Sequence, residues 1–159
     1  MWEPLRRFSL LDSEARGIFL RAAILLPVIA VTLRLRGFRA TQESLLRFRA
    51  HPQQVSQEDS ARLLADVERT RLTVRMVNAA VRHAWPYSTC LAKSLALWWL
   101  LGRQGIASEL RIGARKVQDK FEAHAWVERQ GIAVNEPEQL HRHFAPFDET
   151  LSSKALETQ

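Results

Sequence analysis

The stretch YSTCLAKSLALWWLLGRQG, residues 87–105, constrains the fold most, because its apolar side chains point in nearly every direction around a helix. Ser88 or Thr89 is suited to cap the start of that helix, and Gly105 to end it. A helix that is apolar on all sides must be covered by other elements. We therefore expect a central, buried helix that ends near Gln104. Its apolar residues are Leu91, Leu95, Leu97, Trp98, Trp99, Leu100 and Leu101.

The pattern changes period after this helix. In SELRIGAR (108–115) and FEAHAWVE (121–128), apolar and polar residues alternate, which is typical of half-buried strands. The letters RQG indicate a short turn, and IAVN (132–135) predicts a third strand. Helices followed by an antiparallel sheet predict an α+β fold, with the central helix packed on a small antiparallel sheet. In the second strand Phe121, Ala123, Ala125 and Val127 are expected on one face, and His124 on the other.

The first half of the chain predicts helices only. Two helical pieces, 13–33 and 40–50, are followed by a polar connection at 51–59. Ser56 and Asp59 then resemble a capping box that opens a helix, and Pro86 ends it. We divide the chain into an N-terminal helical region (1–75), a core (76–147) and a C-terminal tail (148–159).

The apolar stretch 18–37 resembles a membrane span, but its uncharged part, 22–33, has only twelve residues. A spanning helix needs about 20 residues. We expect a buried helix, no membrane contact and a cytoplasmic protein. A further hypothesis is that this stretch docks a partner protein, with Arg34, Arg36 and Arg39 behind it.

The composition limits the partners and the chemistry. The net charge of +6 comes mostly from scattered arginines, and no aromatic–basic motif accompanies them, so no nucleic-acid partner is expected. A single cysteine in 159 residues excludes an internal disulfide and a zinc finger.

That cysteine, Cys90, falls at the first or second residue of the central helix, where the helix dipole and unpaired N–H groups favour a thiolate. His124 lies in the middle of a strand that must pack near this helix, so it is the candidate base.

Counting along the hairpin gives a third candidate. If residues 129–131 form a three-residue loop, Glu128 pairs with Ile132, and Glu136 then stands opposite His124 and orients it. A two-residue turn would place Pro137 there instead. Asn135 is a competing partner for His124, although a regular strand turns it to the other face.

A metal site is the alternative to a catalytic triad. Cys90, His124 and Glu136 would then be three zinc ligands with one open position, and His141 and His143 further ligands. A cysteine at a helix start that faces a histidine on a strand is more typical of thiol catalysis, so no metal and no cofactor are expected. His51 and His83 are interpreted as surface residues.

Residues 86–137 resemble a known family through the segments Cys-Leu, Ser-Leu-Ala-Leu, Arg-Ile-Gly and His-Ala-Trp-Val-Glu, in that order. They are similar to the lasso-peptide B2 proteins of the microcin J25 processing type, bacterial cysteine peptidases with a transglutaminase-like, papain-related core. The resemblance implies that Cys90 is the nucleophile and His124 the base. The family's third residue is usually Asp after an Asn, a place held here by Glu136 after Asn135.

The resemblance also implies a reaction and partners. The peptidase would cut the leader from a ribosomally made precursor, with a separate B1 protein recognising the leader and an ATP-dependent cyclase closing the new amino terminus. Two rival interpretations remain open: the same triad passes the acyl group to an amine, as transglutaminases do, or the chain is a non-catalytic scaffold for the cyclase.

Overall fold

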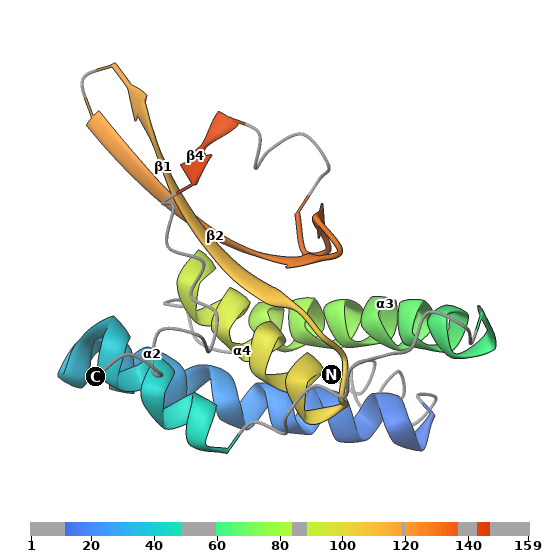
Figure 1. Cartoon of the computed structure of the whole chain (residues 1–159). Helices are drawn as coiled ribbons and strands as arrows, with labels where there is room; N and C mark the ends of the chain where they lie inside the picture. The colour runs from blue at the N-terminus through green and yellow to red at the C-terminus, as the bar shows by residue number, and fades with distance from the viewer. Residues whose placement is uncertain (1–11, 49–59, 84–88, 119, 137–142, 147–159) are drawn as a thin grey trace, which may run out of the picture.

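The computed structural model describes residues 12–48, 60–83, 89–118, 120–136 and 143–146, and every structural statement below concerns these ranges. Three helices form one layer, and a small sheet rises from it (Figure 1). The sheet is four-stranded, with strand order β3-β2-β1-β4. The predicted α+β class is confirmed. The elements in chain order are α2 (Ser13–Arg47), α3 (Ser60–His83), α4 (Cys90–Arg103), β1 (Glu109–Val117), β2 (Lys120–Arg129), β3 (Ile132–Ala133) and β4 (Ala145–Pro146).

The predicted central helix is α4. Thr89 caps it, because its side-chain oxygen accepts a hydrogen bond of 3.2 Å from the Ala92 amide. After its end Gly105 adopts a φ of 75°, a left-handed conformation that glycine takes without steric cost. Five of the seven apolar side chains expected on α4 are at most 2% exposed, whereas Leu91 and Trp99 are half-buried, so the helix is buried on most of its surface. The five are Leu95, Leu97, Trp98, Leu100 and Leu101.

One hydrophobic core joins the three helices to the sheet. Leu26 of α2, Val77 of α3 and Val127 of β2 all belong to the cluster that surrounds α4. The expected division between residues 75 and 76 falls inside α3, whereas the tail 148–159 lies outside the described residues. An ion pair of 3.5 Å between Arg129 and Asp66 also ties the end of β2 to α3.

α2 covers the two helical pieces expected at 13–33 and 40–50, of which residues 49 and 50 lie outside the described ranges. It is one element with a break at Gly37, whose φ of 75° and ψ of −178° interrupt the helix. Only one side of α2 is buried. The expectation of a buried helix is therefore right for that side and wrong for the opposite side. By length and composition the helix could cross a membrane, and only 22% of its most apolar window is buried inside the protein. The buried residues of its first 17 positions are Ala15, Ile18, Ala22, Leu26 and Ile29.

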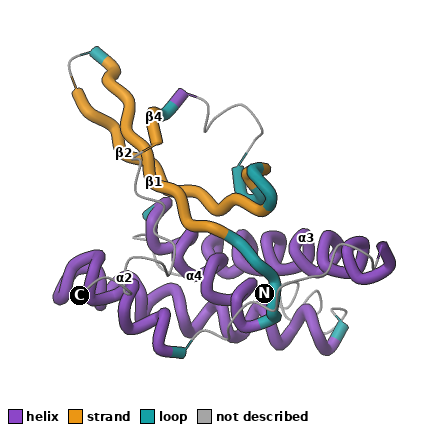
Figure 2. The backbone as a smooth tube through the Cα atoms, in the orientation of Figure 1, coloured by secondary structure: helices purple, strands orange, loops and turns teal. Residues whose placement is uncertain are grey.

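The hairpin of β1 and β2 extends beyond the helices that cover its base (Figure 2). Its register runs from Glu109 opposite Glu128 to Val117 opposite Lys120. Ala125 and Val127 are buried as expected, but Phe121 is 80% exposed because the far half of the hairpin has no helix against it. The alternation of residues therefore marks the strand correctly and overestimates how much of it is covered.

The turn between β2 and β3 contains two residues rather than three. Arg129 pairs with Ile132 and Glu128 with Ala133, so the predicted pairing of Glu128 with Ile132 is wrong. Gln130 and Gly131 both have positive φ, 52° and 76°, as a type I′ turn requires. The third strand is also shorter than predicted, since β3 ends at Ala133.

Candidate active site

The chain segment that follows β3 positions the candidate site. The Val134 amide donates to the Val127 carbonyl at 2.9 Å, which continues the ladder by one bond. In a regular antiparallel pair the Val134 carbonyl would accept the return bond from the Val127 amide. Here that amide donates to Oδ1 of Asn135 at 2.8 Å. The Asn135 side chain takes the place of a backbone acceptor, and the chain leaves the sheet.

The other end of the same amide group reaches helix α4. Asn135 Nδ2 donates to Ser94 Oγ at 3.1 Å, and Ser94 Oγ donates to the Ala125 carbonyl at 2.8 Å. Ser94 is fully buried and Asn135 is 7% exposed. Three hydrogen bonds thus join α4, β2 and the segment after β3 in a place that excludes water. Buried polar groups of this kind hold one arrangement, because each lost bond leaves an unpaired group.

This arrangement brings Glu136 to His124. His124 Nε2 lies 3.5 Å from Glu136 Oε1, and the two side chains are 15% and 11% exposed. Strand counting with the observed two-residue turn would place Pro137 opposite His124, but the chain bends after Ala133 and Glu136 arrives instead. Pro137 itself is outside the described residues. The predicted contact is therefore present although the register that predicted it is wrong, and the orienting role of Glu136 stays a prediction.

The contact with Glu136 does not fix the orientation of the His124 ring through a hydrogen bond. Although Glu136 Oε1 is 3.5 Å away, the buried Nε2 atom makes no hydrogen bond within the described part of the chain. The contact is thus a close approach of the ring to the carboxylate without a hydrogen bond.

Lys93 connects the pair to the start of α4. Its Nζ lies 3.8 Å from the same Glu136 oxygen and donates to the Asn135 carbonyl at 3.5 Å. Lys93 follows Cys90 by three residues, and side chains at that spacing share one face of a helix. Cys90, which is half-buried and begins α4, therefore lies on the helix face that carries Lys93 towards Glu136. Lys93 thus ties the Glu136–His124 pair to the first turn of α4, which Cys90 begins.

Aromatic rings cover the imidazole. The ring centroid of His124 is 5.1 Å from that of Phe144 and 6.2 Å from that of Trp126. Opposite His124 in β1 stands Gly113. A Cβ at position 113 would lie 2.8 Å from the Ala145 carbonyl oxygen and 3.1 Å from Phe144 Cβ, so glycine permits the close approach of β4.

Sequence reasoning missed four residues that support this site. Gly113 carried a signal, because a glycine inside an alternating strand often marks the close approach of another backbone. Ser94 and Lys93 carried no such signal, since serine and lysine are common residues in helices. Phe144 directly precedes β4, a strand that was not predicted.

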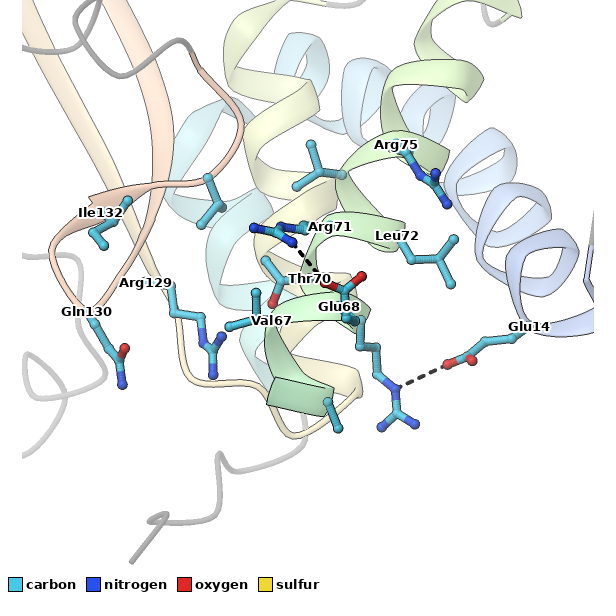
Figure 3. A pocket seen from close by; sticks show the side chains of 14 residues that line it. Glu14, Val67, Glu68, Thr70, Arg71, Leu72, Arg75, Arg129, Gln130 and Ile132 are labelled. Atoms are coloured by element: carbon cyan, nitrogen blue, oxygen red, sulfur yellow. Dashed lines mark hydrogen bonds and ion pairs between the residues drawn. The ribbon is translucent and has the colours of Figure 1, made fainter. Parts of the chain in front are cut away.

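A cavity of about 900 Å³ lies elsewhere, between α3 and the turn from β2 to β3 (Figure 3). Arg69, Arg71, Arg75 and Arg129 line it, and ion pairs join Arg69 to Glu14 and Arg71 to Glu68. Its lining reaches Val134, but none of the three candidate catalytic residues belongs to it.

The alternative metal site receives no support from the geometry. Among the described residues, no group of three or more His, Cys, Asp and Glu side chains is placed to hold a metal ion. His143 and His83 are exposed, whereas His51 and His141 lie outside the described ranges.

A thiol at the first residue of a helix, and a histidine–carboxylate pair tied to that helix by Lys93, are groups that thiol-dependent acyl chemistry uses. Comparison with known families agrees with this class. The model of the transglutaminase-like superfamily matches residues 25–148, and the chain belongs to this superfamily. Membership supports a papain-like cysteine peptidase or acyltransferase kind of activity. No curated protein and no solved structure matches the chain.

Proposed function

We propose that the protein is a cysteine peptidase that removes the leader from a ribosomally made lasso-peptide precursor. The observation that carries the proposal is the placement of Cys90 at the start of α4, on the face from which Lys93 reaches the Glu136–His124 pair. Membership of the transglutaminase-like superfamily supports the class of chemistry. The resemblance of residues 86–137 to lasso-peptide B2 proteins supports the substrate.

The proposed reaction proceeds through a thioester. Because Nε2 of His124 faces Glu136, the other ring nitrogen, Nδ1, is the one that takes the proton from the Cys90 sulfur. The sulfur attacks the carbonyl carbon of the scissile bond, and the imidazolium returns the proton to the leaving amine. Water, deprotonated by His124, then releases the leader as a carboxylate. Backbone N–H groups in the first turn of α4 stabilise the oxyanion.

The proposed partners follow from the same resemblance. A separate B1 protein holds the leader in trans, since the helices that precede the core carry no strand in the described residues. An ATP-dependent cyclase then uses the amine that the cut releases. The reaction requires no cofactor and no metal.

Cleavage is tested with the precursor, the B1 protein and the full chain, followed by mass spectrometry. The wild type is expected to release leader and core peptides, and Cys90→Ala to release none while it keeps its fold and its binding to B1. His83→Ala is the matched control for His124→Ala, because His83 is exposed. Cleavage at the normal rate by Cys90→Ala would remove the catalytic assignment.

A second assay needs no substrate, because Cys90 is the only cysteine. Iodoacetamide labels the thiolate, so the rate of labelling at neutral pH reports how well the site activates the sulfur. We expect slower labelling in His124→Ala than in wild type and in His83→Ala. Equal rates in all three proteins would show that His124 does not activate Cys90.

Acyl transfer to an amine is the second candidate, because the superfamily supports acyltransferases as well as peptidases. Both reactions share the thioester and differ in what attacks it. Added hydroxylamine separates them: a peptidase yields leader that ends mainly in a carboxylate, whereas a transferase yields mainly the hydroxamate. Predominant hydroxamate at low hydroxylamine concentration would favour the transferase.

A further inference from the structure

Helix α2 carries a second apolar face that the protein core does not use. Five large aliphatic side chains, which we call the outer stripe, are 51–78% exposed and recur every three or four residues: Leu20, Ile24, Val28, Val31 and Leu35. At about 100° per residue they fall within an arc of about 80°. The buried residues of the helix, such as Ala22 and Ile29, lie on the opposite side.

The charges around the outer stripe have one sign. Arg16 and Arg34 follow one border of the stripe and Arg21 follows the other, by the same helical geometry. Between Glu14 and Glu43 the sequence contains five arginines and no acidic residue. An aliphatic face bordered by cations is complementary to a surface that is apolar inside and anionic outside.

A second copy of the chain is a poor match to this face. Two outer stripes packed together would bring arginines of both copies side by side, and like charges at an interface are unfavourable. The stripe is also small: about 22 Å long and about 10 Å wide, it offers roughly 200 Å², whereas a stable protein interface needs about 800 Å² per partner. A lipid surface requires neither shape complementarity nor a minimum area.

We propose that the outer stripe of α2 lies on an anionic lipid surface, with its aliphatic side chains among the acyl chains and the bordering arginines at the headgroups. Helices that lie in the membrane interface have this composition. Because the opposite side of α2 packs into the protein core, the helix rests on the membrane and does not cross it. The proposal departs from the sequence-based expectation of no membrane contact, which counted this helix as buried.

Sedimentation with vesicles tests the proposal on the full chain. We expect the wild type to pellet with vesicles of phosphatidylcholine and phosphatidylglycerol at least about tenfold more than with phosphatidylcholine alone, and less at high salt. Ile24→Gln combined with Val31→Gln should lower binding at least about tenfold, because two half-exposed aliphatic side chains no longer enter the lipid. Arg21→Gln should lower binding to the anionic vesicles only.

Leu64→Gln is the matched control, since Leu64 is 69% exposed on α3, outside the stripe. It should bind vesicles like the wild type. Each variant must keep the wild-type melting temperature and the wild-type rate of Cys90 labelling, so the test is independent of the proposed peptidase activity. Wild type that stays in solution with both vesicle types would overturn the proposal. So would a dimer, measured by light scattering without vesicles, that the stripe variant abolishes.

Discussion

Asn135→Ala is the perturbation with the largest calculable effect near the site. The substitution removes the acceptor of the Val127 amide and the donor to Ser94 Oγ. Val127 is fully buried, so its N–H group would remain without a partner at a cost of about 1–3 kcal/mol. Ser94 still donates to the Ala125 carbonyl, so the second loss costs about 0.5–1.5 kcal/mol.

The free energy of unfolding should therefore fall by about 1.5–4.5 kcal/mol. Urea unfolding measures this, and at a slope of about 2 kcal/mol per molar the midpoint should fall by about 0.8–2.2 M. Asn135→Asp keeps an oxygen for the Val127 amide but buries a carboxylate and loses the donor to Ser94 Oγ, so it should be destabilised as well. A double-mutant cycle with Ser94→Ala should give a coupling energy of about 0.5–1.5 kcal/mol.

The reasoning would be refuted by an Asn135→Ala midpoint that corresponds to less than about 0.5 kcal/mol of destabilisation, which is typical of an ordinary surface substitution. The same variant should also label Cys90 more slowly under native conditions. The reason is that Asn135 determines where the next residue, Glu136, meets His124.

Three more substitutions test the surroundings of the imidazole. Glu136→Ala should slow cleavage less than His124→Ala, for which we expect a loss of about 10²–10⁴-fold in turnover; equal activity of Glu136→Ala and wild type would remove Glu136 from the triad. Gly113→Ala should lower stability by about 1–3 kcal/mol, seen as a lower melting temperature, because its Cβ would press on the Ala145 carbonyl and Phe144. Lys93→Met should change stability by less than about 1 kcal/mol yet slow Cys90 labelling, and unchanged labelling would show that Lys93 does not help to hold Glu136.

The sequence predicted the elements whose residues carry a strong local pattern. The all-round apolar helix α4, its cap at Thr89 and the alternation of β1 and β2 all follow from side-chain spacing. The position of Cys90 at the first residue of α4 follows from the same cap. These features depend on residues that are close in the sequence, so counting is enough to find them.

The β2–β3 register could not be predicted, because it depends on which residues adopt positive φ. Gln130 does so at 52°, although glutamine is not a residue that indicates a left-handed conformation. Likewise, no local pattern shows that a side-chain amide will replace a strand carbonyl. The Asn135 bonds join residues that are eight and 41 positions apart in the chain.

The outer stripe of α2 shows a different limit of sequence reasoning. A helix that is apolar on two faces has a weak periodic signal, and the sequence does not say which face meets the core. The structure decides it through contacts with distant elements: Leu26 and Ile29 pack with Val77, whereas Ile24 and Val28 point outward. Hydropathy alone therefore cannot distinguish the side of α2 that stabilises the fold from the outer stripe, which is available to a partner. The stripe and the site are on separate parts of the molecule, so each can be altered and measured without the other.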